Sequence, residues 1–173
     1  MFMNRVVHWI VASLILAIYL MGSLIFLKGT TAEINLVHWH QPLGILVLLF
    51  TIWRLVVWFR PNKESAEMLG IGGSRLLAKI PLIAQICILT GCFLMPIFGI
   101  LMTFFGGYAL HLGIVDIPSF LSKNKAAADF FYQAHNTLAL ILLLLILLHA
   151  AGGIRHYLVM RSLKKKMALL LNP

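Results

Sequence analysis

Four histidines lie near the ends of three long apolar stretches of this chain, at His8, His40, His135 and His149. An ionisable side chain in an apolar stretch of membrane length is energetically expensive, so such a residue usually marks a functional site. Imidazoles are common ligands of haem iron, and helix bundles bind cofactors through side chains on facing helices. These histidines therefore predict a haem-binding bundle within a membrane.

The composition also indicates a membrane location. The chain has 173 residues, of which 61% are hydrophobic and 11% are charged, whereas soluble domains carry about 25% charged residues. The net charge of +9 comes from clustered Lys and Arg residues with few aromatic residues among them, which argues against binding of nucleic acid. The C-x-x-C-H motif is absent, so any haem would be bound without thioether bonds.

Four apolar stretches are long enough to cross a bilayer as helices. They predict an all-α, integral membrane four-helix bundle, a single domain over residues 1–173, with spans at about residues 8–27, 40–59, 80–105 and 134–157. The first stretch is too long for the hydrophobic region of a secretory signal, so we expect it to be retained. The 60–79 connection is predicted to be a polar loop. The 106–133 segment is predicted to be a longer loop, either functional or a simple connector.

The positive charges predict how this bundle is oriented. Four spans place both termini on one side of the membrane, and most Lys and Arg residues lie in the two terminal segments and in the 60–79 connection. The other two connections carry Lys28, Lys123 and Lys125. Because loops rich in Lys and Arg stay on the cytoplasmic side, we expect both termini to be cytoplasmic.

The four histidines fall at two depths of the predicted bundle. His40 begins the second span and His135 the fourth, so both are expected near the outer face. His149 follows His135 by fourteen residues, which places it about 21 Å deeper and within about 40° of the same helical face. It thereby reaches the level of His8. A single membrane histidine is more often a packing residue, but two matched pairs favour ligation of one six-coordinate b-type haem at each level.

Further residues fit this interpretation, each with an alternative. Arg54 is expected at the inner level, where it would pair with a haem propionate or extend to the cytoplasmic interface. Gly44, one turn after His40, and Gly91 in the third span would leave room for a porphyrin, although small residues also pack membrane helices against one another. His156, near the inner surface, would contact a propionate or simply end the helix. The spans contain no acidic residue, which argues against a proton-coupled transporter.

His38 and His111 belong to neither of the two predicted haem-binding pairs. His38 points about 200° away from His40 on a helix, so the two cannot face the same haem. A zinc site formed by these two alone is not expected. His111 lies in the outer loop and is expected to be a solvated residue.

Several motifs occur in a specific order along nearly the whole chain. They are V-H-W-I at 7–10, H-Q-P-L-G at 40–44 followed by Arg54, M-P-I-F-G at 95–99, A-H-N-T-L at 134–138 and L-H-A-A-G-G-I-R-H-Y at 148–157. In this order and spacing, the chain resembles the bacterial dihaem cytochrome b561 family, and within it the superoxide oxidase-like members. The resemblance implies that two haem b groups are bound, with iron ligands at His8, His40, His135 and His149.

The resemblance further implies an oxidoreductase of the bacterial inner membrane, surrounded by membrane lipid, that binds ubiquinone and exchanges electrons with the quinone pool. In the superoxide-oxidising members, the donor at the outer face is superoxide, which becomes molecular oxygen. Lys28, Lys123 and Lys125 would then steer this anion toward the edge of the outer haem. The chain departs from the family at Gln85, where a histidine is frequent, and at Asn136, where an acidic residue is frequent. These departures concern the quinone site and the donor, not the four histidines.

Two other functions follow from different interpretations of the same features. A dihaem relay subunit would pass electrons between quinol and a partner redox protein, and it would need a docking surface for that partner. A haem-free transporter or scaffold would use the histidines for packing alone. The matched depths of the histidine pairs favour a haem protein, whereas the physiological electron donor does not follow from the sequence.

Overall fold

The computed structural model describes residues 2–25, 31–58 and 80–171, and most of these lie in four long helices. The helices are α1 (Phe2–Leu24), α2 (Thr31–Trp58), α4 (Ile80–Phe105) and α5 (Lys125–Leu171). Two short strands, β1 (Leu110–His111) and β2 (Asp116–Ile117), form the only sheet within the described ranges. The predicted loop at 60–79 lies outside the described residues.

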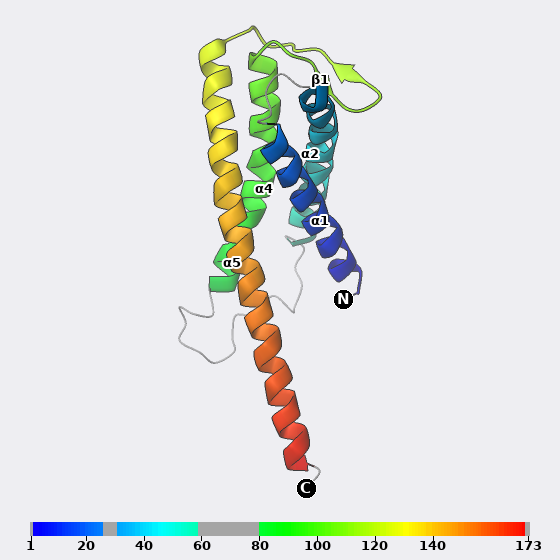
Figure 1. Ribbon diagram of the computed structural model, residues 1–173, viewed down its shortest axis with the longest axis vertical. Helices are drawn as coiled ribbons and strands as arrows, with labels where there is room; N and C mark the ends of the chain where they lie inside the picture. Colours follow the sequence, from blue (N-terminus) through cyan, green and yellow to red (C-terminus); the bar gives the residue numbers. More distant parts are fainter. Residues whose placement is uncertain (1, 26–30, 59–79, 172–173) are drawn as a thin grey trace.

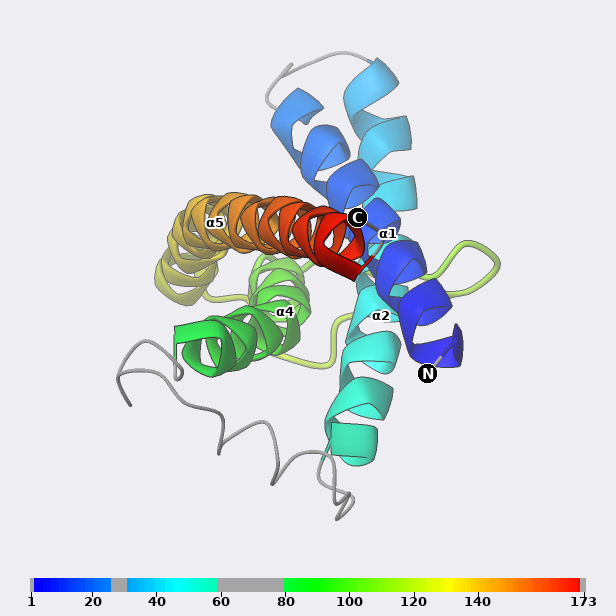
Figure 2. The same ribbon diagram turned by 90° about the horizontal axis from the view of Figure 1, so that it is seen from below.

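The four helices form two antiparallel pairs. α1 packs against α2 and α4 packs against α5, while α2 joins the pairs by packing against α4. The strands lie at one end of the bundle, and both ends of the chain point toward the opposite end (Figure 1). Seen from below, the α1–α2 pair and the α4–α5 pair lie beside each other (Figure 2). The predicted all-α four-helix bundle is confirmed.

Each helix contains a segment able to cross a bilayer. These segments are Val6–Leu24, Asn35–Val56, Leu82–Phe105 and Lys125–Lys165. Large apolar side chains such as Leu16, Leu49 and Leu144 are exposed on the outside of the bundle. Water would make so much exposed apolar surface unfavourable, whereas lipid accommodates it and the helices satisfy their own backbone hydrogen bonds. The chain is therefore a multi-pass membrane protein.

The fourth helix starts earlier than predicted. The sequence pattern placed residues 106–133 in a loop and began the last span at 134, whereas α5 begins at Lys125. The side-chain Oδ1 of Asn124 accepts a hydrogen bond from the backbone N–H of Ala127 at 3.1 Å, which is the usual interaction of a helix N-cap. The alanines that follow are the strongest helix formers. The connection between α4 and α5 is therefore only 106–124.

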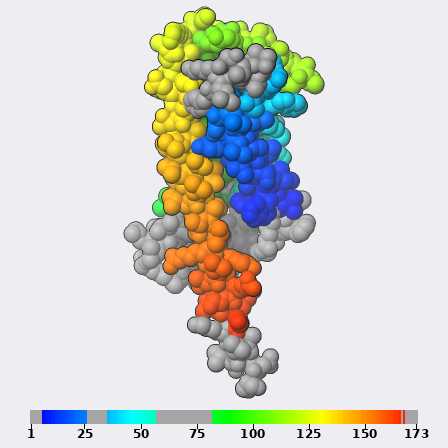
Figure 3. Space-filling model, in the orientation of Figure 1, coloured from blue at the N-terminus to red at the C-terminus, as the bar shows by residue number. Residues whose placement is uncertain are grey.

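The fourth helix also ends later than predicted, at Leu171 instead of near residue 157. Its last part extends beyond the rest of the bundle (Figures 1 and 3). The length of an apolar segment indicates how much of a helix lies in lipid, but it does not indicate where the helix ends. Residues 158–171 are rich in Leu, Met, Lys and Arg, which have high helix propensity, so the helix continues into polar surroundings. α2 likewise begins at Thr31, ahead of the span predicted from residue 40.

Gly91 brings α4 and α5 into close contact. A Cβ placed on Gly91 would lie 2.5 Å from Cδ2 of Leu142, a buried residue of α5. A side chain at this position would displace Leu142, so Gly91 allows α4 and α5 to pack closely, as the packing alternative predicted. Nearer the strands, the rings of Phe105 and Phe131 stack with centroids 5.8 Å apart and planes inclined by 3°.

The 106–124 connection contains a folded β-hairpin at the end of the bundle. Leu110 pairs with Ile117 and His111 with Asp116 in antiparallel register. Gly113 at the turn has φ of 89°, a conformation that glycine adopts without strain. β1 packs on both α2 and α4. The hairpin therefore covers the end of the bundle near which His40 and His135 lie.

A candidate dihaem site

The structure brings the four predicted histidines together as two pairs. His40 of α2 faces His135 of α5, with ring centroids 6.2 Å apart and planes inclined by 66°. His8 of α1 faces His149, further along α5, with centroids 6.3 Å apart and planes inclined by 63°. The pairing at two depths that helical spacing predicted is the one observed. Ligation of iron by these residues stays a prediction.

The separation within each pair fits a metal ion held between two imidazoles. A metal–nitrogen bond of about 2.0 Å, plus about 1.1 Å from the nitrogen to the ring centre, puts two opposite ring centres about 6.2 Å apart. The observed separations of 6.2 and 6.3 Å agree with this value. Both pairs therefore have the spacing required of the two axial ligands of a haem.

The helix arrangement leaves room for a flat group between the paired rings. α5 packs against α4, but over the described ranges it makes no comparable contact with α1 or α2, the helices that its histidines face. A Cβ placed on Gly44 would meet no heavy atom within 4 Å. This agrees with the room for a porphyrin predicted beside Gly44, one turn after His40.

His135 is held in a defined orientation by α4. Its Nδ1 lies 3.0 Å from the backbone carbonyl oxygen of Met95. A carbonyl only accepts, so Nδ1 carries the proton and Nε2 is the nitrogen available to a metal, an arrangement typical of histidine ligands. A Cβ placed on Gly99 would lie 3.3 Å from Cε1 of His135. The imidazole thus rests directly on the backbone of α4.

His40 rests on α1 in the same way. A Cβ placed on Gly22 would lie 3.3 Å from its Cε1. Its Nδ1 is buried, lies on the α1 side of the ring and is close to the backbone carbonyl of Ile18. Nε2 is therefore the nitrogen that remains for a metal ion. The sequence assigned no role to Gly22, and it offered Gly99 only as the end of the M-P-I-F-G motif, because each glycine lies on a different helix from the imidazole it contacts.

Arg54, the cation predicted beside a haem propionate, lies near the pair formed by His8 and His149. Arg54 is half-buried and lies close enough for its charge to act on His8, so it lies at the level of the His8–His149 pair. Its pairing with a propionate stays a prediction. His156 is exposed on α5, and because the helix continues to Leu171, the alternative that His156 ends the helix is wrong. Its contact with a propionate also stays a prediction.

The three lysines predicted to attract an anion are not equivalent. Lys28 lies outside the described residues. Lys125 forms an exposed ion pair with Asp129, its Nζ lying 2.5 Å from Oδ2, so a neighbouring negative charge partly offsets its own. Lys123 is exposed and makes no ion pair with any residue that the structure describes. Lys123 is therefore the best placed of the described lysines to act on an approaching anion.

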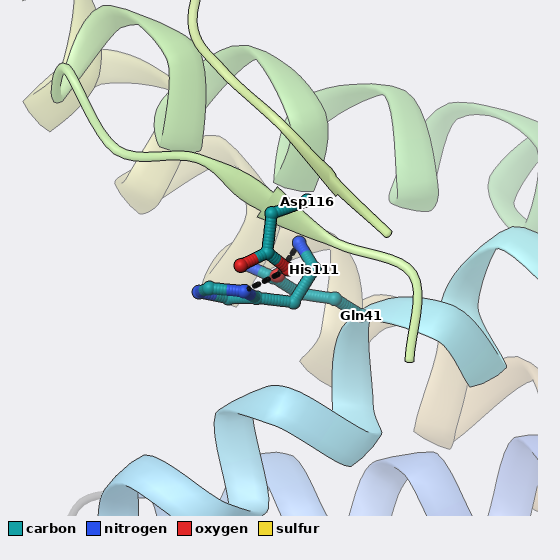
Figure 4. Close-up of polar contacts among 3 residues, drawn as sticks. All are labelled: Gln41, His111 and Asp116. Carbon is teal, nitrogen blue, oxygen red and sulfur yellow. Dashed lines mark hydrogen bonds and ion pairs between the residues drawn. The ribbon is translucent and has the colours of Figure 1, made fainter. Parts of the chain in front are cut away.

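A polar cluster that the sequence did not predict lies at the end of the bundle that carries the hairpin. His111, expected to be solvated, has its Nδ1 2.6 Å from Oδ1 of Asp116. Its backbone N–H donates to Oε1 of Gln41 at 2.7 Å (Figure 4). Because Gln41 directly follows His40, this hydrogen bond holds the hairpin against the turn of α2 that carries a predicted haem ligand.

Comparison with known proteins agrees with this geometry. No curated protein matches the chain. The sequence does match the family described as prokaryotic cytochrome b561 over residues 2–168, which includes all four membrane-crossing segments. The match extends over nearly the whole chain. The chain therefore belongs to the prokaryotic cytochrome b561 family, whose members are membrane proteins that bind haem b and transfer electrons.

Proposed function

We propose that this protein binds two haem b groups and transfers electrons from superoxide at the outer face of the membrane to ubiquinone. The observation that carries the proposal is the presence of two histidine pairs, with centroid separations of 6.2 and 6.3 Å, at two levels of one bundle. Bound haem supplies one-electron redox chemistry. Two histidines per iron leave no open coordination position, so we expect electron transfer without binding of oxygen to iron.

The residues of the chain would hold and orient these groups. His40 and His135 would bind the outer haem, and His8 and His149 the inner one. The Met95 carbonyl fixes the His135 ring. In the overall reaction, two superoxide anions lose one electron each and become molecular oxygen, while one ubiquinone gains two electrons and two protons.

This function requires the outer pair to face the periplasm. At the other end of the bundle, α5 carries exposed basic residues, including Arg155, Arg161, Lys164 and Lys165. Because basic segments stay in the cytoplasm, we place that end and both termini in the cytoplasm of a bacterial inner membrane. The hairpin then lies on the periplasmic side.

The proposal is tested on purified protein by visible spectroscopy with a pyridine-haemochrome count. We expect two haem b groups per chain that become reduced under a flux of superoxide and are reoxidised when a ubiquinone is added. The same assay with superoxide dismutase present should show no reduction. Two haems that ignore superoxide but are reduced by quinol would favour the relay subunit, and a protein without haem would contradict both functions.

Removal of the positive charge at Arg54 is expected to lower the reduction potential of one haem. Oxidised haem carries one more positive charge than reduced haem, so a nearby cation favours the reduced form. A unit charge about 10 Å from iron, at an effective dielectric constant of about 20, contributes roughly 1.7 kcal/mol, or roughly 70 mV for one electron. Spectroelectrochemical titration of Arg54→Leu should therefore show one potential lowered by tens of millivolts. Arg54→Lys is the control, and an equal shift in both variants would contradict an effect of charge.

Reversal of the charge at Lys123 is expected to slow reduction by superoxide. Electrostatic steering acts on the rate of encounter and weakens as salt screens the charge. For one exposed lysine we expect Lys123→Glu to lower the second-order rate about two- to fivefold at low salt and hardly at all at high salt. Lys165→Glu makes the same change of net charge at the opposite end of the bundle and should leave the rate unchanged. Equal rates for the two variants would contradict steering by Lys123.

A further inference from the structure

A third pair of histidines lies at the outer end of the bundle, apart from the two predicted haem pairs. His38 of α2 and His111 of β1 have ring centroids 4.2 Å apart and planes inclined by 57°. They are distant in the sequence and meet because the hairpin folds onto the first turns of α2. The hydrogen bond from the His111 backbone N–H to Gln41 Oε1, at 2.7 Å, holds the hairpin there.

The distance between the ring centroids of His38 and His111 fits a different coordination geometry from the distances within the two predicted haem pairs. Two imidazoles bound to one metal ion at adjacent square-planar positions, about 90° apart, have ring centres about 4.4 Å from each other, against about 6.2 Å for opposite positions. The 4.2 Å between His38 and His111 is close to the value for adjacent ligands.

Asp116 prepares one of the two rings for this role. Its Oδ1 lies 2.6 Å from Nδ1 of His111, and the strand register places the two residues directly opposite each other. A carboxylate on one imidazole nitrogen fixes the ring and leaves the other nitrogen as the metal ligand. In Figure 4 the ring of His111 points away from the hairpin, with one nitrogen toward Asp116. The His111 side chain is 29% exposed and His38 is exposed, so an ion can reach both.

We propose that His38 and His111 bind a divalent transition metal ion, Cu²⁺ or Zn²⁺, at the outer end of the bundle. Imidazole nitrogen suits these ions, whereas Mg²⁺ and Ca²⁺ prefer oxygen. The described residues contain no group of three or more His, Cys, Asp or Glu side chains placed to hold a metal. The site therefore has two protein ligands with water at the remaining positions, and Asp116 orients His111 instead of binding the ion. An ion bound here would link the hairpin to α2 two residues before His40.

The test uses the full chain, loaded with haem and carrying no polyhistidine tag, so that the four predicted haem ligands do not compete. Cu²⁺ is added in steps while its electron paramagnetic resonance spectrum is recorded. We expect one Cu²⁺ per chain with hyperfine structure from imidazole nitrogen, and displacement of that ion by excess Zn²⁺. His38→Ala and His111→Ala should each weaken binding more than about tenfold, and Asp116→Asn about tenfold, since removal of a carboxylate behind a ligand typically costs that much.

Asp129→Asn is the matched control, because it removes one carboxylate at the same end of the bundle without touching His111. It should leave the affinity for Cu²⁺ unchanged. The haem content of every variant is measured first to show that it has folded. If the parent protein binds no Cu²⁺ at millimolar concentration, or if both single histidine variants bind it as tightly as the parent, the proposed site is wrong. An equal loss in Asp116→Asn and Asp129→Asn would show a general effect of charge and would overturn the role assigned to Asp116.

Discussion

Replacement of His40 by alanine is expected to lower the haem content from two groups to one per chain and to abolish reduction by superoxide. His40 is the imidazole that faces His135 at 6.2 Å, and alanine offers no nitrogen to a metal. The inner pair uses α1 and a more distant part of α5, so its haem should remain. A pyridine-haemochrome count and the visible spectrum measure the loss. If the outer haem is retained through His135 alone, the reduced protein should bind carbon monoxide, which the parent should not.

Two variants separate this effect from a general loss of folding. His8→Ala removes a member of the inner pair and should also leave one haem, but one that superoxide still reduces. His38→Ala lies two residues before His40 on α2, points elsewhere and should keep both haems. An unchanged haem spectrum in His40→Ala would show that His40 is not an axial ligand. The assignment of the outer pair would then have to be abandoned.

The pairing of the histidines was predictable because it depends only on helix geometry. The fourteen residues between His135 and His149 fix their relative depth and face on α5, whatever surrounds that helix. The order of spans then decides which of the other histidines lies at each level. The same regularity placed Arg54 beside His8. These predictions required only the rise and twist of a helix and the alternation of direction between successive spans.

The contacts that orient the imidazoles were not predictable in the same way. Gly22 and Gly99 touch His40 and His135 across helix interfaces, and no spacing within one helix reveals such neighbours. Gly91 looked equally suited to a porphyrin and to helix packing, and only its contact with Leu142 decided for packing. Small residues carry little directional information in a sequence, because their role is set by what the other helix places against them.

The ends of α5 show the limit of hydropathy as a guide. The apolar stretch predicted the part of the helix in lipid, but Asn124 starts the helix before it and propensity extends the helix beyond it. The N-cap was detectable in the sequence, because Asn124 lies two residues before a run of three alanines. The hairpin was harder to predict, because two-residue strands leave almost no periodic signal. The cluster of His111, Asp116 and Gln41 consequently became visible only in three dimensions.

Replacement of Gly99 by leucine is expected to remove most of the outer haem while leaving the inner haem in place. A Cβ at this position would already lie 3.3 Å from Cε1 of His135, and the further carbons of leucine need the space that the ring occupies. The ring cannot simply tilt, because its Nδ1 donates to the Met95 carbonyl at 3.0 Å. Movement of the imidazole would break that hydrogen bond and turn Nε2 away from His40. The haem count and the spectrum of the remaining haem measure the effect.

A graded pair of substitutions separates this steric effect from an effect on the helix. Alanine stabilises a helix by about 1 kcal/mol relative to glycine, so Gly99→Ala should not weaken α4 and should cost only a small displacement of the ring. We therefore expect nearly full haem content in Gly99→Ala and a large loss in Gly99→Leu. Ala151→Leu is the control, because Ala151 is exposed on α5 and lies about 200° around the helix from His149. If Gly99→Leu kept both haems, the ring of His135 would not need the surface of α4, and its orientation would have to depend on the Met95 carbonyl alone.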